Sequence, residues 1–161
     1  MKIKKAMLFL LAGIMLFSLM GCQRSTEKRQ YFTVDTGDDV VLEVDKESDY
    51  KIKFDAPYLI IKDGQTYLEG SFIGANDYDN LKMIVSMDPN AKFIDKYEQD
   101  ENEYYVFAAE DEAGEGLEYF AFIWIEKSNT CASFVSTRSE EEVLDALSAI
   151  SFKLLPKAPG T

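Results

Sequence analysis

Carboxylates are the abundant acid/base groups of this sequence. Its 161 residues include 29 Asp and Glu, 17 Lys and Arg, and no histidine. Without an imidazole, the chain has no Ser-His-Asp or Cys-His nucleophile pair, no HExxH metalloprotease motif and no histidine-ligated metal. The net charge of −12 argues against a surface for nucleic-acid phosphates. We therefore expect no nucleic-acid partner, no metal, no cofactor and no catalytic residue.

Two acidic clusters contain enough oxygen atoms to attract calcium. They lie at residues 77–80 and 111–118, in segments that we predict to be loops. Neither has the alternate ligands, central glycine and distal glutamate of an EF-hand, so we interpret both as solvated loops. A glycosidase needs two carboxylates about 5–10 Å apart in a cleft, and no such pair is singled out. A carboxylate-based hydrolase is therefore the weaker alternative for the function.

The first 22 residues have the order of an export signal: charged, then apolar, then small. Lys2, Lys4 and Lys5 precede a run of apolar and small residues over 6–20, which ends at Gly21 and Cys22. This run is shorter than the roughly 20 residues that span a bilayer. An uncleaved signal anchor with an incidental cysteine is the alternative interpretation.

Residues 19–22, Leu-Met-Gly-Cys, resemble the lipobox of bacterial lipoproteins. The resemblance implies that diacylglycerol is attached to Cys22 and that a peptidase cuts between Gly21 and Cys22. Two acyl chains are enough for stable anchoring. The expected partner is thus the cell membrane, reached through the lipid on Cys22, with the protein facing the extracytoplasmic side.

A second cysteine, Cys131, lies in the apolar segment Cys-Ala-Ser-Phe-Val. If Cys22 carries lipid, Cys131 has no intrachain disulfide partner. The chain also has no histidine that would activate it as a nucleophile. We therefore predict a buried thiol that packs as a small hydrophobic group.

The composition divides the chain into four parts. We predict a signal peptide over 1–21, the lipidated cysteine and a polar tether over 22–30, one α+β domain over 31–155 and a disordered tail over 156–161. Residues 1–21 contain three lysines and no acid, so their removal changes the net charge from −12 to −15. The basic tether residues Arg24, Lys28 and Arg29 either contact anionic head groups or only keep the linker soluble.

Alternating apolar and polar residues predict strands through most of the domain. The clearest run is 50–55, with Ile52 and Phe54 on one face and lysines on the other. Similar runs occupy 58–62, 66–73, 81–87, 92–97, 103–110, 117–126 and 132–137. Asp63-Gly64 predicts a tight hairpin, and the connections are too short for crossover helices. The sheet should therefore be an antiparallel meander.

One amphipathic helix is predicted near the C-terminus, over about 140–150. Ser139 and Glu142 have the spacing of a capping box. The apolar residues on one helix face are Val143, Leu147 and Ile150. Residues 151–155 then return as a last strand. The predicted fold is α+β, a mostly antiparallel β-meander sheet with one C-terminal amphipathic helix packed on it.

The runs at 104–109 and 117–126 are apolar on both faces, so both faces of the sheet must be covered. Either the N-terminal strands between residues 31 and 54 close over the second face, or part of that face is a groove for a partner or ligand. The candidate contacts of such a binding surface are Tyr104, Tyr105, Tyr119 and Trp124.

A twisted antiparallel sheet followed by a late helix and a short strand, over 139–153, is similar to the PsbP/Mog1-type α+β fold. That fold normally has further helices, and none is predicted here. The resemblance implies a non-catalytic assembly or binding module. We expect a binding or inhibitory module on the membrane surface, whose acidic body meets a basic envelope protein or peptide. A structural or assembly subunit of an envelope complex is the alternative.

Overall fold

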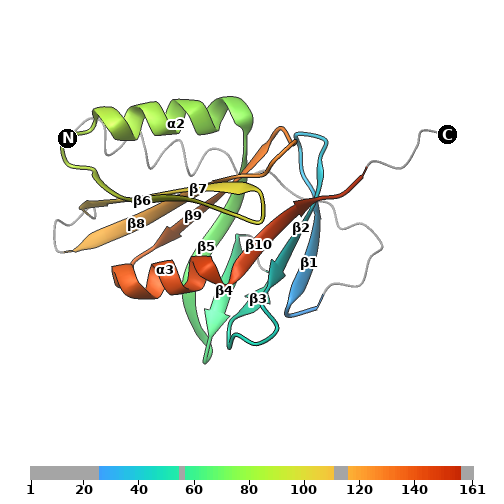
Figure 1. Ribbon diagram of the computed structural model, residues 1–161. Coiled ribbons are helices and arrows are strands. Elements are labelled where there is room, and N and C mark those ends of the chain that lie inside the picture. The colour runs from blue at the N-terminus through green and yellow to red at the C-terminus, as the bar shows by residue number, and fades with distance from the viewer. Residues whose placement is uncertain (1–25, 55–56, 111–115, 157–161) are drawn as a thin grey trace.

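The computed structural model describes residues 26–54, 57–110 and 116–156, which form two antiparallel sheets and two helices (Figure 1). The small sheet consists of β1 (Arg29–Thr33), β2 (Asp39–Val44) and β10 (Ile150–Leu154). The large sheet consists of β3 (Lys51–Lys53), β4 (Tyr58–Lys62), β5 (Gln65–Gly74), β6 (Lys92–Gln99), β7 (Asn102–Glu110), β8 (Leu117–Trp124) and β9 (Thr130–Ser136). The helices are α2 (Ala75–Met87) and α3 (Glu140–Ser148). The predicted α+β class with a mostly antiparallel sheet is confirmed.

The large sheet is not a single meander. Its strand order is β3-β4-β5-β9-β8-β7-β6, so β5 pairs with β9, and α2 makes the crossover from β5 to β6. Residues 81–87, predicted as a strand, form the second half of α2, and the acidic residues 77–80 lie in this helix rather than in a loop. The buried residues of α2 are Tyr78, Leu81 and Val85, at the helical spacing of three and four. The strand prediction was wrong because apolar residues also occupy every second position of 81–87, and that window leaves out Tyr78.

Two tight hairpins set the register of the large sheet. The predicted hairpin between β4 and β5 is confirmed, and Asp63 and Gly64 at its tip have φ values of 52° and 73°. Two successive positive φ values are what a type I′ turn requires. The turn between β6 and β7 has the same signature at Asp100 (φ 50°) and Glu101 (φ 68°), although neither residue is glycine. β7 therefore returns directly beside β6.

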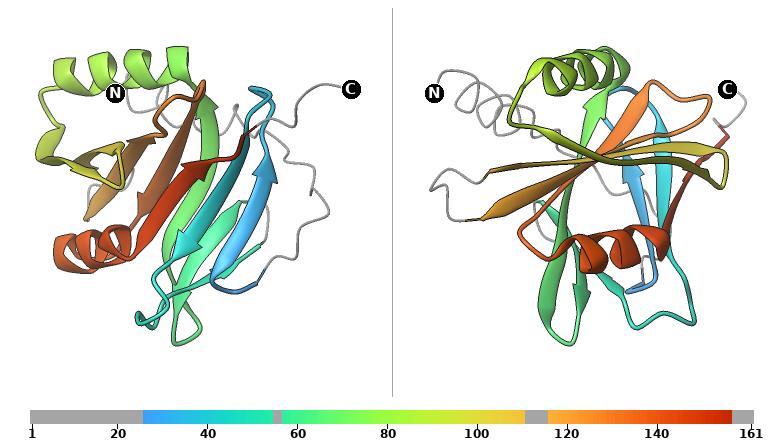
Figure 2. Two further views of the ribbon diagram at one scale, coloured as in Figure 1. Left: turned by 45° about the vertical axis from the view of Figure 1, so that its right-hand side comes forward. Right: turned by 60° about the vertical axis from the view of Figure 1, so that its left-hand side comes forward.

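The predicted capping box begins α3. The Ser139 hydroxyl accepts a hydrogen bond from the Glu142 amide, and the Glu142 carboxylate accepts one from the Ser139 amide at 3.1 Å. The buried residues of α3 are Val143, Ala146 and Leu147. The helix ends before Ile150, which instead begins β10. β10 then pairs with β2, so the C-terminal strand belongs to the small sheet (Figure 2).

Both faces of the large sheet are covered, by different elements. On one face, Tyr104, Val106 and Tyr119 share a core with residues of β1, β2, β10 and α3. On the other face, Phe107 and Phe122 pack with the buried residues of α2 in a second core. In Figure 1, α2 lies above the strands β6 to β9 and α3 lies below them. The N-terminal strands therefore do cover one face, but they share it with α3, and the unpredicted α2 covers the other.

Side chains from β6 and β7 hold the small sheet against the large one. The buried Asn102 donates from Nδ2 to the Phe152 carbonyl (2.8 Å) and accepts from the Glu126 amide (3.0 Å). Tyr104 and Gln99 both donate to the Ile150 carbonyl, at 2.9 and 3.0 Å. No strand of the described residues pairs with this side of β10, and the three bonds to it satisfy the carbonyls of Ile150 and Phe152.

The fold begins earlier than the predicted domain start at Tyr31. β1 starts at Arg29, and Gln30, which we assigned to the tether, is buried. Within the same expected tether, the carbonyl of Glu27 accepts from the Ile52 amide and that of Lys28 from the Val44 amide. Residues 26–30 are therefore part of the folded body. The signal peptide, Gly21, Cys22 and residues 157–161 of the predicted tail lie outside the described residues.

Candidate functional site

The four aromatic residues predicted as one binding surface lie on opposite faces of the large sheet. Tyr104 is fully buried and Tyr119 is 8% exposed, both in the core shared with the small sheet. The Tyr104 hydroxyl donates to the Ile150 carbonyl. Their assignment as contacts for a partner was wrong, because strand alternation turns them toward the face that α3 and the small sheet cover.

Tyr105 and Trp124 lie on the other face and are only half-buried. α2 packs mainly on β5, β8 and β9 and leaves side chains near the β6 edge exposed. Phe93 on β6 is 55% exposed, and its ring centroid lies 5.4 Å from that of Tyr105. We call this region the β6–β7 shelf and define it as Tyr78, Lys82, Phe93, Lys96, Glu103 and Tyr105.

Glu103 is the centre of the charges on the β6–β7 shelf. One carboxylate oxygen, Oε1, accepts from the Tyr78 hydroxyl at 2.5 Å and from Lys82 Nζ at 3.2 Å. The other, Oε2, lies 2.8 Å from Lys96 Nζ. Lys82 Nζ also lies 4.5 Å from the ring centroid of Tyr78. The cluster joins α2, β6 and β7.

The surroundings of Glu103 fix its charge. Partial burial alone raises the pKa of Glu103, but hydrogen bonds from Lys96, Tyr78 and Lys82 outweigh burial and lower this pKa to about 2. Burial and the Glu103 carboxylate raise the pKa of Tyr78 well above its ordinary value of 10. At neutral pH the carboxylate is therefore ionised and the phenol protonated.

These protonation states suit binding better than proton transfer. A general acid or base works best when its pKa lies near the operating pH, and neither Glu103 nor Tyr78 meets that condition. Exposed aromatic rings are instead enriched at protein–protein contacts, which have a polar rim.

The free edge of β6 is protected against pairing with another strand. Among the described strands, β7 alone pairs with β6. A bulge interrupts the β6–β7 register between Phe93 and Asp95, and four of the eight residues of the strand are charged. Bulges and charges of this kind disfavour an added strand. Contacts at the β6–β7 shelf should therefore come from side chains rather than from backbone pairing.

The acidic clusters and Cys131, which the sequence also singled out, have the following places in the structure. Residues 77–80 lie in α2, and 111–115 lie outside the described residues. Within the described ranges, no group of three or more Cys, Asp or Glu residues is placed to hold a metal ion. The buried Cys131 thiol is confirmed, and burial raises the pKa of this thiol.

A buried carboxylate, Asp38, has a structural role. Asp38 is 4% exposed, and its Oδ2 accepts from the Asn129 amide at 2.7 Å and from the Thr130 hydroxyl at 2.9 Å. These bonds join the β1–β2 connection to the β8–β9 turn. Both hydrogen bonds to this oxygen come from the protein itself, so the role of Asp38 is to connect these two loops.

The sequence did not single out five residues of the β6–β7 shelf, which are Tyr78, Lys82, Phe93, Lys96 and Glu103. Glu103 had a visible signal, because it is the one charged residue on a strand face that continues with Tyr105 and Phe107. Tyr78 and Lys82 are four residues apart and share a face of α2. Their proximity could be predicted only from a helix in this segment, and the sequence predicted a strand over 81–87.

No family model, curated protein or solved structure gives a significant match to this chain. Among the described residues, neither helix has the length and apolar character needed to cross a membrane.

Proposed function

We propose that the chain is a non-catalytic binding or inhibitory module, held on the extracytoplasmic side of the cell membrane by lipid on Cys22. Its binding surface is the β6–β7 shelf. The observation that carries this proposal is the position of Phe93 and Tyr105, whose neighbouring rings lie beside the ionised Glu103 cluster near an exposed sheet edge.

The net charge of the whole body favours a cationic protein or peptide as the partner. The shelf itself holds two lysines, Lys82 and Lys96, and one carboxylate, Glu103. Acids lie next to it at Glu98, which is opposite Glu103 on β6, and at the turn residues Asp100 and Glu101. The chain without residues 1–21 carries a net charge of −15. Complementary charge speeds association and is screened by salt, with a Debye length near 10 Å at 0.1 M.

The resemblance to the PsbP/Mog1-type fold supports a non-catalytic role. That fold normally has helices besides the late one, and α2 on the opposite sheet face supplies such a helix. The sequence predicted one C-terminal amphipathic helix. The described residues contain two helices, one on each face of the large sheet.

The β6–β7 shelf is tested with a photo-crosslinking amino acid at position 93 in the full-length chain. We expect crosslinks to a cationic envelope protein, whose purified form then binds the mature chain more weakly as salt increases. The double variant Phe93→Ser and Tyr105→Ser should weaken this binding at least tenfold, about 1.4 kcal/mol. The control is Phe54→Ser, which removes another exposed aromatic ring, 44% exposed, next to β3 at the opposite sheet edge. Equal losses in both variants, or hydrolysis of a cell-wall substrate by the pure protein, would refute the proposal.

The anchor is tested separately. Replacement of Cys22 by Ala should release the protein from membranes or leave the signal uncleaved. Membrane retention of a fully cleaved Cys22→Ala chain, reversed only by detergent, would show that lipid on Cys22 is not the anchor.

A further inference from the structure

The outer face of α2 exposes two methionines. Met83 is 55% exposed and Met87 is 74% exposed. They are four residues apart and therefore share a helix face, which is opposite to the buried face of Leu81 and Val85. The other methionines of the sequence all lie within residues 1–20. Both methionines of the described chain are thus on this surface, and neither core of the described residues contains one.

These two residues, which we call the methionine pair, continue the β6–β7 shelf. Lys82, which precedes Met83, belongs to the shelf, and its Nζ lies 5.9 Å from the ring centroid of Tyr105. The connection from α2 to β6 is short, so Phe93 of the shelf follows the pair closely in the chain. The described residues have five exposed large apolar side chains, and three of them are Met83, Met87 and Phe93. Apolar side chains exposed in one region indicate an interaction surface.

The charges around the methionine pair favour a cationic partner. Both lysines of the region, Lys82 and Lys96, are paired with Glu103, at 3.2 and 2.8 Å. Two exposed acids lie nearby, Asp79 one helical turn before the pair and Glu98 opposite Glu103 on β6. Neither of these two acids forms a salt bridge within the described part of the chain. The three carboxylates outnumber the two lysines, so this surface has the same negative sign as the whole body.

We propose that the methionine pair extends the β6–β7 shelf, and that the joint surface binds a cationic segment of the partner that also carries apolar side chains. The inference rests on the proposed function and adds the chemistry of the partner's contact segment. Apolar side chains of that segment pack on the thioethers, because unbranched methionine side chains adapt to different shapes. Its lysines or arginines lie beside Asp79 and Glu98. A second copy of this chain fits the surface poorly, because both copies carry the same strong negative charge.

The methionine pair is also the probe for the test. In the mature chain, residues 22–161, isotope labelling of the methionine methyl groups gives two NMR signals, one from each member of the pair. The test ligand is a synthetic amphipathic peptide of leucine and lysine. One control peptide has glutamate in place of lysine, and another has serine in place of leucine. Calorimetry measures the affinity of each peptide for the chain.

We expect the peptide of leucine and lysine to shift both methyl signals and to bind more weakly as salt increases. Both control peptides should bind at least about tenfold more weakly, because each lacks one of the two kinds of contact. The double variant Met83→Gln and Met87→Gln should also weaken binding of the test peptide by about tenfold or more. Both side chains are exposed, so this variant should fold normally.

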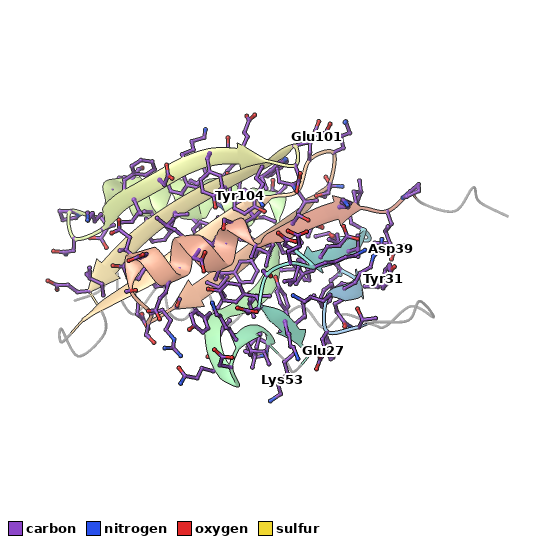
Figure 3. All side chains as sticks on the ribbon, turned by 60° about the horizontal axis from the view of Figure 1, so that its bottom comes forward. Glu27, Tyr31, Asp39, Lys53, Glu101 and Tyr104 are labelled. Carbon is purple, nitrogen blue, oxygen red and sulfur yellow. The ribbon has the colours of Figure 1, made fainter. Side chains whose placement is uncertain are left out.

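The control variant removes apolar surface elsewhere. Phe54→Gln and Leu117→Gln replace the two other exposed large apolar side chains of the described residues, which are 44% and 42% exposed. Phe54 follows Lys53 at the end of β3, and Figure 3 shows Lys53 on the opposite side of the molecule from Glu101, in the turn between β6 and β7. The affinity of this variant for the test peptide should be nearly unchanged, because neither side chain belongs to the proposed surface.

Equal losses of affinity in the two double variants, or unchanged methyl signals when the peptide is bound, would overturn the inference. Methyl signals that change with protein concentration alone would identify a second copy as the occupant and would overturn it too. If Phe93→Ser with Tyr105→Ser weakens peptide binding and Met83→Gln with Met87→Gln does not, the methionine pair is refuted and the proposed function stands. The reverse result supports the methionine pair and refutes the β6–β7 shelf of the proposed function.

Discussion

The ring of Tyr58 lies over Gly70, its cross-strand partner, so closely that a Cβ atom on Gly70 would lie 2.2 Å from Cε2 of Tyr58. The Phe134 ring approaches the same point to 2.6 Å. The Gly70→Ala variant should therefore lose about 1–3 kcal/mol of stability, the usual cost of overpacking a core. Urea unfolding measures this loss. In a Tyr58→Leu background the same change should cost clearly less, and identical costs in both backgrounds would contradict this packing argument.

Asn102 should be essential for the attachment of the small sheet. The Asn102→Ala variant leaves the Phe152 carbonyl and the Glu126 amide without their partner, and the buried Phe152 carbonyl alone costs about 1–3 kcal/mol. The control is Gln99→Ala, because the Ile150 carbonyl keeps its bond from Tyr104 in that variant. Equal unfolding midpoints for the two variants would show that Asn102 has no special role.

Leu147 anchors α3 to the core between the sheets and is fully buried. The Leu147→Ala variant should lose about 2–5 kcal/mol, as buried leucine truncations do. Leu144 on the same helix is only partly buried, so Leu144→Ala should cost less. Chemical denaturation of both variants checks the order, and a negligible effect of Leu147→Ala would mean that the helix does not depend on this contact.

Glu103 should make the free energy of unfolding depend on pH between about 4.5 and 2. Its pKa in the folded protein is about 2, below its ordinary value of 4.5, so the ionised carboxylate stabilises the fold fully above pH 4.5. This contribution is lost as the pH falls toward 2. The stability difference between the wild type and Glu103→Gln should therefore be largest at pH 7 and shrink below pH 4.5. A difference that stays constant from pH 7 to pH 3 in urea titrations would contradict the assignment.

Cys131 is a natural probe of α2, because its thiol lies in the core beneath that helix. In the Cys22→Ser chain Cys131 is the one remaining thiol. The added variant Leu81→Ala, which weakens the contact of α2 with the sheet, should speed thiol labelling by tenfold or more, since each 1.4 kcal/mol changes the open population about tenfold. Leu147→Ala weakens the other core and should speed labelling less for the same loss of stability. Equal acceleration would mean that α2 opens only with the whole fold.

The local features of the fold could be read from short stretches of sequence. The Asp63-Gly64 hairpin, the Ser139 capping box and the buried Cys131 each depend on a few neighbouring residues, and the structure has all three. The apolar runs on both sides of β7 and β8 also required two covered faces, as the structure shows. These properties follow from backbone geometry and side-chain burial within single elements.

Only the tertiary structure decided which elements meet. Over residues 81–87 the strand and helix periods both fit the apolar pattern, and burial of Tyr78 and Leu81 against the sheet selects the helix. That choice makes α2 a crossover, so β5 pairs with β9, and it brings Lys82 to Glu103 across 21 positions of the chain. Likewise, alternation along β7 separates Tyr104 from Tyr105, but only the docking of the small sheet determines which of them is buried. Contacts between residues far apart in the sequence depend on how complete elements pack, and a local pattern carries no information about that packing.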